Sequence, residues 1–110
     1  INLQDLKNEN SIIFIDITAD WCATCQFNKI NVINSGEIKE YFEKFDVIKV
    51  RGDWTKPNKK IENYLKSFSK FGIPFNVIYV GQNDTEILSE LLSRDDIIDI
   101  LNQITKNSNN

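Results

Sequence analysis

The fold of this chain is decided by residues 11–25, which read Ser-Ile-Ile-Phe-Ile-Asp-Ile-Thr-Ala-Asp-Trp-Cys-Ala-Thr-Cys. Residues 11–18 are rich in Ile and Phe, and a short apolar run of this kind is typical of a buried strand. Asp16 interrupts the run with a carboxylate, which is unusual at a core position. From Cys22 onward the pattern changes to helical spacing, so the pair Cys22 and Cys25 follows a strand and opens a helix.

Outward from this segment, helices and strands alternate along the chain. Strands that alternate with helices imply parallel pairing through crossovers, and a closing hairpin adds an antiparallel edge. We therefore predict an α/β fold with a four-stranded mixed β-sheet flanked by helices on both faces. The first expected elements are a short helix at 2–10, the strand at 11–18, and a helix with Phe27, Ile30, Val32 and Ile33 at helical spacing. A helix capped by Ser35 follows, with Ile38, Tyr41, Phe42 and Phe45 on its buried side, and then a strand at 47–50 and a loop at 52–55. The last expected elements are a helix with Pro57 in its first turn, a strand at 75–80, its hairpin partner at 85–88, and a helix capped by Ser93.

Length and composition fit one domain of ordinary size. The chain has 110 residues, of which 41% are hydrophobic, so it can bury a stable core without structural disulfides or metal ions. We expect a single domain over 1–110, with its core at about 11–105 and a polar tail at 106–110 that frays. The chain begins without Met, and its apolar run at 12–15 is far shorter than the about 20 residues of a membrane span. We therefore expect a soluble, monomeric fragment of a longer, membrane-anchored chain.

Charge and residue usage exclude several classes of function. The 13 Lys and Arg and 16 Asp and Glu leave a net charge of −3, with both signs scattered along the chain, so nucleic acid is not expected as a partner. The absence of His excludes a Ser-His-Asp triad, a Cys-His dyad and a His-ligated metal.

The two cysteines, spaced C-x-x-C, allow three interpretations. A tetrahedral zinc site needs four N or S ligands, and this pair supplies half of them, which leaves only a site shared across a dimer. A structural disulfide over so short a loop would add only about 2 kcal/mol of stability. A redox-active dithiol needs one exposed thiol at a helix N-terminus, where backbone N–H groups stabilise a thiolate, and a second thiol one turn later. The position of Cys22 and Cys25 between a strand and a helix favours this third interpretation.

Residues 15–25 resemble the active-site segment of the thioredoxin superfamily, and residues 72–74, Gly-Ile-Pro, resemble its cis-proline loop. Together with residues 52–55 and 64–68, the segment 19–22 looks more specifically like the C-terminal soluble domain of DsbD-type thiol:disulfide interchange proteins. Two features depart from thioredoxin itself: Ala-Thr stands between the cysteines in place of Gly-Pro, and Phe75 follows Pro74 in place of Thr.

The resemblance implies a thioredoxin-like fold and a protein-disulfide reductase in which Cys22 attacks a partner disulfide and Cys25 resolves the mixed disulfide. It implies that the redox-active Cys22–Cys25 pair works without a cofactor and without a metal. It implies disulfide-bearing partners, among them proteins of the thioredoxin fold, and a transmembrane domain of the parent chain as electron donor. The corresponding location is the periplasmic side of the bacterial inner membrane. Two alternatives stay open: a stand-alone cytoplasmic thioredoxin, and a redox-silent thioredoxin-fold module that binds peptides.

Two further residues gain expected places near the dithiol, and one of them, Asp16, gains an expected role in proton transfer. The resemblance places at Asp16 a buried carboxylic acid, with a raised pKa, that moves protons for Cys25. Read from the sequence alone, Asp16 could instead face solvent at a strand edge. Lys49 matches a lysine that lies near this acid in thioredoxin, and it could equally be an exposed strand lysine.

The remaining expected site residues lie at the partner-facing surface. The resemblance implies a cis Ile73–Pro74 bond that faces the cysteines and leaves the preceding backbone free to pair with a substrate strand. Trp21 is expected to shield the dithiol and to offer surface to a partner. The acid Asp20 disfavours a thiolate at Cys22. Since Asp16 and Asp20 are the nearest ionisable groups in sequence, we expect the dithiol to be a reductant rather than a strong oxidant.

Overall fold

A computed structural model of the chain describes residues 11–82 and 84–108. The helix expected at 2–10 lies outside the described residues. The described elements are, in order, β1 (Ile12–Thr18), α2 (Ala23–Asn28), the π-helical turn η1 (Lys29–Ile33), α3 (Gly36–Lys44), β2 (Ile48–Asp53), α4 (Lys59–Ser67), β3 (Phe75–Val80), β4 (Asp84–Ile87) and α5 (Arg94–Ser108). In the part of the chain that is described, no helix combines the length and apolarity that crossing a bilayer requires.

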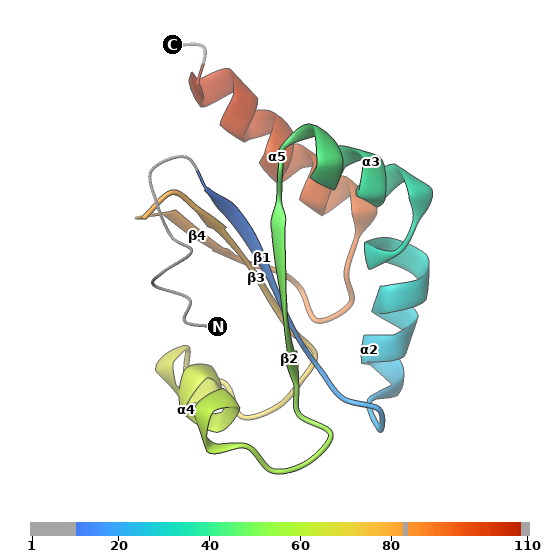
Figure 1. The fold of residues 1–110 in the computed structure, drawn as a ribbon, viewed down its shortest axis with the longest axis vertical. Coiled ribbons are helices and arrows are strands. Elements are labelled where there is room, and N and C mark those ends of the chain that lie inside the picture. Colours follow the sequence, from blue (N-terminus) through green and yellow to red (C-terminus); the bar gives the residue numbers. More distant parts are fainter. Residues whose placement is uncertain (1–10, 83, 109–110) are drawn as a thin grey trace.

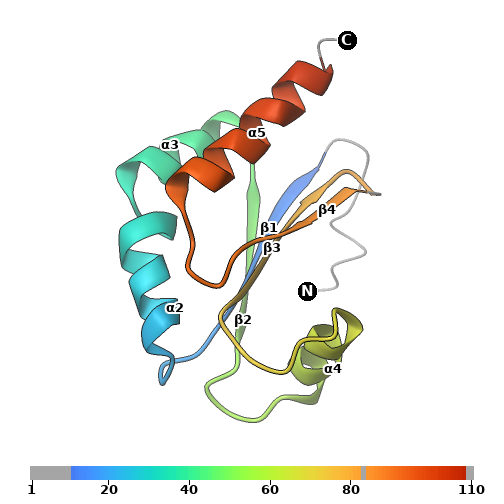
Figure 2. The ribbon, with the colours of Figure 1, turned by 180° about the vertical axis from the view of Figure 1, so that it is seen from behind.

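The sheet has the strand order β2-β1-β3-β4. β1 pairs in parallel with β2 and antiparallel with β3, and β3 forms an antiparallel hairpin with β4. Helices α2, α3 and α5 lie over one face of the sheet and α4 lies over the other (Figures 1 and 2). The predicted four-stranded mixed sheet with helices on both faces is therefore confirmed.

The alternation of side chains along β1 divides the core into two layers. Phe14 points toward α3 and α5, where its ring lies 5.3 Å from that of Phe42 and the cluster includes the fully buried Ile38, Ile97 and Leu101. The residues of β1 with odd numbers, from 13 to 17, point toward α4 and pack with Leu65. Full burial of one such side chain stabilises the fold by about 1.5–3 kcal/mol. The same alternation places Asp16 on the Phe14 face.

Two boundaries near β2 differ from the sequence prediction. β2 continues through Gly52 and Asp53, which were expected in a loop. Both residues pair with the end of β1, and Gly52 lies close to it: a Cβ at this position would lie 2.6 Å from Cδ1 of Ile17. Helix α4 begins at Lys59 after an Asn58 cap, so Pro57 precedes the cap and is not in the first turn.

The helical segment after the cysteines also differs from the expected regular helix. α2 passes directly into η1, and a π-helical turn accommodates one extra residue and re-aims the side chains that follow. Phe27 and Ile30 are consequently 52% and 69% exposed, whereas Val32 and Ile33 are buried. At the other end of the chain, α5 extends to Ser108, so the helix includes the first residues of the segment expected to fray.

Candidate active site

The two cysteines form a disulfide at the start of α2. β1 ends at Thr18, and a tight turn follows in which the Cys22 N–H donates to the carbonyl of Ala19 at 3.2 Å. Cys22 is the N-cap residue of α2, and its Sγ accepts a hydrogen bond from the backbone N–H of Cys25 at 3.2 Å. Cys22 was expected to be exposed, but in this disulfide form it is 7% exposed and Cys25 is 3% exposed. Cys22 is still the more accessible of the two.

The disulfide is covered from the loop that precedes β3. Ala19, Cys22 and Cys25 form a small buried cluster, and Ile73 packs against it. The Ile73–Pro74 peptide bond is cis, and Pro74 is buried. Side-chain cover for the disulfide therefore comes from Ile73.

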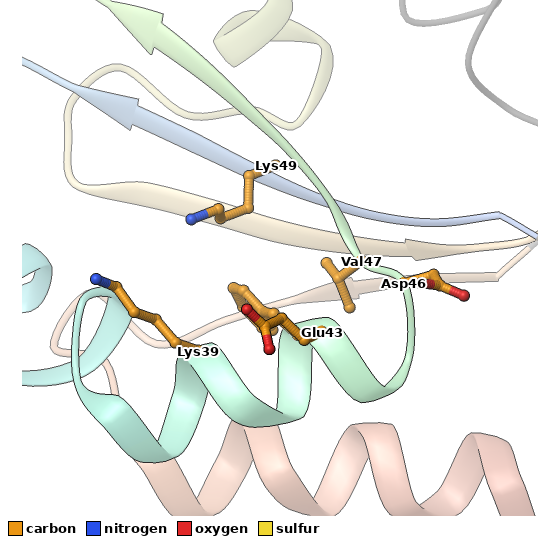
Figure 3. Close-up of a pocket in the computed structure, with 6 residues that line it drawn as sticks. Lys39, Glu43, Asp46, Val47 and Lys49 are labelled. Carbon is orange, nitrogen blue, oxygen red and sulfur yellow. The ribbon is translucent and has the colours of Figure 1, made fainter.

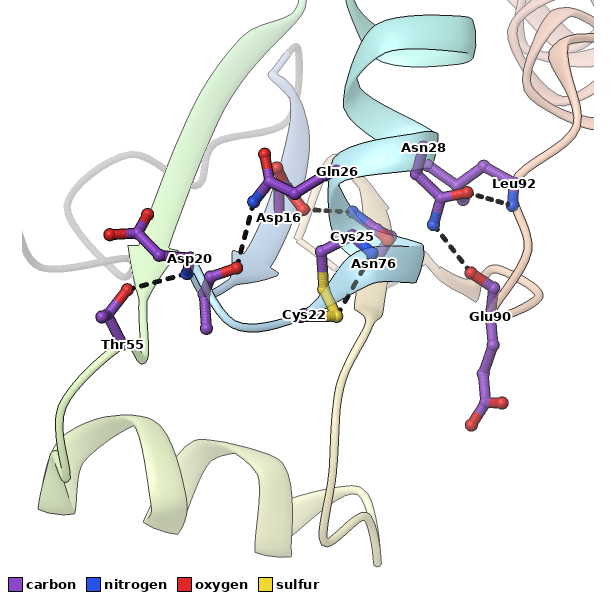
Figure 4. Close-up of a disulfide and its surroundings, with 11 residues drawn as sticks. Asp16, Asp20, Cys22, Cys25, Gln26, Asn28, Thr55, Asn76, Glu90 and Leu92 are labelled. Carbon is purple, nitrogen blue, oxygen red and sulfur yellow. Dashed lines mark hydrogen bonds between the residues drawn. A yellow bond between two sulfur atoms is a disulfide. The ribbon is translucent and has the colours of Figure 1, made fainter.

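Trp21 lies at the surface next to the disulfide. Its side chain is 61% exposed, and its ring packs against Trp54 with the centroids 6.3 Å apart. The indole N–H donates to the carbonyl of Thr55 at 3.2 Å. Asp20 is exposed, and its backbone N–H donates to Oγ1 of Thr55 at 2.9 Å. The loop before Cys22 is thus bound to the segment that follows β2 (Figure 4).

Asp16 lies in the middle of the sheet, because β1 is flanked by β2 and β3. The alternative of an acid at a strand edge is therefore wrong. Its neighbours in register are Arg51 and Asn76, and the Asn76 amide donates to its Oδ1 at 2.8 Å (Figure 4). Burial raises the pKa of Asp16 above its ordinary value, while the Asn76 hydrogen bond and the charges of Arg51 and Lys29 act in the opposite direction.

Lys49 is exposed and stands between two surface pockets. One pocket, of about 510 Å³, lies between α3 and β2, and Lys49 and Lys39 both extend into it (Figure 3). The second, of about 200 Å³, is lined by Asp16, Lys29, Lys49 and Arg51. Lys49 therefore shares a pocket with the acid, but the cations that influence the pKa of Asp16 are Arg51 and Lys29.

The sequence analysis missed three residues around the site, although signals in the sequence could have identified them. Arg51 lies two residues after Lys49 on a strand, so strand alternation puts both on one face. Lys29 follows Cys25 by one helical turn. Asn76 is 1% exposed in a strand that is otherwise apolar, and a buried amide of this kind needs a hydrogen-bonding partner.

Asn28 connects the cysteine helix to the segment between β4 and α5. The side chain is 1% exposed, and its amide donates to the carbonyl of Glu90 at 2.8 Å. Its Oδ1 accepts from the N–H of Leu92 at 3.0 Å (Figure 4). One buried side chain thereby fixes the segment before α5 to the helix that carries Cys25.

Within residues 11–82 and 84–108, no cluster of three or more His, Cys, Asp or Glu side chains could hold a metal ion. The chemistry that the described residues offer is that of two sulfur atoms, a half-buried carboxyl group and the amides around them.

Comparison with known proteins agrees with this geometry. Residues 2–81 match the model of a family described as thioredoxin-like. The chain is 27% identical over 81 residues to the thiol:disulfide interchange protein DsbD of Pasteurella multocida, a match that covers 74% of this chain and 14% of that protein. It is 23% identical over 95 residues to the DsbD protein of Campylobacter jejuni strain RM1221, covering 86% of this chain and 16% of the relative. The chain therefore spans less than a fifth of the length of these relatives.

Solved structures share the fold. The oxidised C-terminal domain of DsbD from Neisseria meningitidis superposes with a TM-score of 0.70 at 21% identity, covering 86% of this chain and 81% of that one. A mutant thioredoxin from Halobacterium salinarum gives a TM-score of 0.65 at 20% identity, covering 92% and 80%. The resemblance drawn from the residues around Cys22 and Cys25 is confirmed by the match of residues 2–81, and the chain belongs to the thioredoxin-like family.

Proposed function

We propose that this chain is a thiol–disulfide oxidoreductase that acts as a protein-disulfide reductase through Cys22 and Cys25. The observation that carries the proposal is the Cys22–Cys25 disulfide at the start of α2, within a thioredoxin-like fold. Support for the class of reaction comes from the relatives, which are named as thiol:disulfide interchange proteins.

The proposed reaction transfers two electrons to the partner. In the reduced protein, the Cys22 thiolate attacks one sulfur of the partner disulfide, a bond forms between the two proteins, and the second partner sulfur leaves as a thiolate. The Cys25 thiolate then attacks Sγ of Cys22. The intramolecular disulfide forms again, and the partner leaves with both of its sulfurs reduced.

Cys22 is the proposed attacking thiol because of its position. It caps α2 and accepts the N–H of Cys25, and a hydrogen bond of this kind is stronger when the acceptor is a thiolate. Cys25 lies a turn inside the helix and is the more buried sulfur, which suits the resolving step.

Asp16 is the proposed proton acceptor for Cys25. Its half-buried position, hydrogen-bonded by Asn76, holds the carboxyl group on the face of the sheet that α2 covers. Lys29, one turn after Cys25, lines the same pocket as Asp16, and its charge acts on the carboxyl group, so the segment that follows the resolving thiol passes near the acid. A carboxylate with a raised pKa is a stronger base than an ordinary one, which suits the acceptance of a proton from a thiol.

Partner recognition is proposed at the surface around the disulfide. Trp21 offers exposed aromatic area, and the backbone at Ile73, before Pro74, would pair with an extended segment of the partner. Asp20 adds a negative charge two residues before Cys22, which would disfavour the thiolate. No role follows for Lys49 beyond lining the pocket of Asp16.

In the cell, we propose that the chain is a relay domain of a transmembrane thiol:disulfide interchange protein, on the periplasmic side of the bacterial inner membrane. It would take electrons from the membrane domain and pass them to thioredoxin-fold or other disulfide-bearing proteins. Similarity to DsbD proteins supports this setting. A stand-alone cytoplasmic thioredoxin is the second candidate, since a solved thioredoxin shares the fold with a TM-score of 0.65.

Trapping of the mixed disulfide tests the proposal. The Cys25→Ser variant should form a stable mixed disulfide with oxidised glutathione through Cys22, whereas Cys22→Ser should form little. The wild-type chain should also exchange reversibly between disulfide and dithiol in glutathione buffers. A chain that shows no reversible couple would be a redox-silent binding module instead.

A further inference from the structure

The segment after β2 forms a hydrogen-bonded clasp on the loop before Cys22. Oγ1 of Thr55 accepts the N–H of Asp20 at 2.9 Å and donates to Oδ1 of Asp53 at 2.5 Å. The N–H of Thr55 donates to the same carboxylate oxygen at 2.9 Å. The Thr55 carbonyl accepts the indole N–H of Trp21 at 3.2 Å. We call Asp53 and Thr55 the clasp.

The clasp lies at the end of the sheet, where its position is well defined. Asp53 is the last residue of β2 and pairs in register with Thr18, the last residue of β1. The N–H of Trp54 donates to the Thr18 carbonyl at 2.7 Å, so the chain continues alongside β1 past the end of the strand. Thr55 is therefore attached to the rigid sheet on one side and to the active-site loop on the other.

The clasp sets the orientation of an exposed aromatic side chain. Trp21 is 61% exposed, and a free indole at the surface samples several rotamers. Here its N–H is bound to Thr55 and its ring lies against Trp54, so one orientation is selected. From the other side, the Gln26 amide donates to the Ala19 carbonyl at 3.0 Å and holds the beginning of the same loop (Figure 4).

We propose that Thr55 and Asp53 are positioning residues that pre-orient Trp21 for docking of protein disulfides, and so favour protein partners over small disulfides. The inference rests on the proposed function, because it assigns how that reaction selects its substrate. A side chain fixed before binding loses less conformational entropy when a partner contacts it. A small disulfide needs only the sulfur of Cys22, so it should not benefit from the orientation of Trp21.

Thr55→Val tests the clasp because it keeps the shape of the side chain and removes both of its hydroxyl hydrogen bonds. Thr55→Ser keeps the hydroxyl group. Thr85→Val, on the exposed strand β4, is the matched control for the same substitution away from the site. The rates of the reduced proteins are measured with insulin as the protein disulfide and with 5,5′-dithiobis(2-nitrobenzoic acid) as the small one.

We expect Thr55→Val to lower the insulin rate about three- to fivefold, while its rate with the small disulfide stays within about twofold. Thr55→Ser and Thr85→Val should match wild type with both substrates. Asp53→Asn, which keeps an acceptor oxygen but removes its charge, provides a second test if Thr55→Val does not fold. It should lower the insulin rate selectively and by a smaller factor.

Equal losses with both substrates, or none with either, would overturn the clasp while the proposed function stands. A wild-type chain that reduces neither substrate would overturn the proposed function itself, and the clasp with it.

Discussion

Asn28→Ala should destabilise the fold strongly, because one side chain satisfies two backbone groups of the segment before α5. Removing it leaves the buried N–H of Leu92 without its acceptor, which costs about 1–3 kcal/mol. The Glu90 carbonyl also loses its donor, but Glu90 is exposed and water can replace the bond, so that loss is about 0.5–1 kcal/mol. The expected loss is therefore about 1.5–4 kcal/mol, a large part of a typical folding free energy of about 5–15 kcal/mol.

Urea denaturation followed by far-UV circular dichroism measures this loss. The urea concentration at the midpoint should fall, while the slope of the free energy of unfolding against urea concentration stays constant. Asn102→Ala, on the exposed face of α5, is the matched control and should change stability by less than about 0.5 kcal/mol. A loss below about 1 kcal/mol for Asn28→Ala would refute the view that this side chain fixes the cysteine helix to the rest of the fold.

Three further predictions concern the sheet and the cysteines. Asp16→Asn should slow the resolution of the mixed disulfide and change the pH profile of that step. It should also stabilise the fold more at pH 7 than at pH 4, because an acid with a raised pKa contributes stability only below its titration range. Equal stabilisation at both pH values in urea denaturation would contradict this prediction. Gly52→Ala should cost about 1–3 kcal/mol through its approach to Ile17, and Ile17→Val, which removes the contacting Cδ1, should reduce that cost in a double-mutant cycle; an unchanged cost would rule out the contact. In the reduced protein, limiting iodoacetamide should label Cys22 before Cys25, as peptide mapping would show, and preferential labelling of Cys25 would reverse their assigned roles.

The parts of the fold that follow from periodicity were predictable from the sequence. The Ile and Phe run of β1 and the apolar run of β3 both gave strands at the expected positions, because each strand is buried on two faces. Ser35 caps α3 as expected, since its hydroxyl oxygen accepts the N–H of Ile38. The position of the cysteines between a strand and a helix followed from the same local patterns.

The parts that depend on long-range contacts were not predictable. The turn η1 breaks the 3.6-residue period, so the exposure of Phe27 and Ile30 could not be read from spacing. The pairing of Asp16 with Arg51 requires the register between β1 and β2, which a single sequence does not give. The role of Thr55 likewise depends on a contact with Asp20, 35 residues away in the chain.

The reduction potential of the Cys22–Cys25 pair tests the central claim most directly. As proposed above, the negative charge of Asp20, two residues before Cys22, would disfavour the thiolate and so leave the disulfide form relatively favoured and the potential low. Equilibration with glutathione or dithiothreitol buffers, followed by tryptophan fluorescence, should give one two-electron transition. Its reduction potential should lie closer to about −270 mV, the value of thioredoxin, than to about −120 mV, the value of the strong oxidant DsbA. A potential above about −180 mV, the range of protein disulfide isomerase, would make the chain an oxidant or isomerase and would contradict its assignment as a reductase.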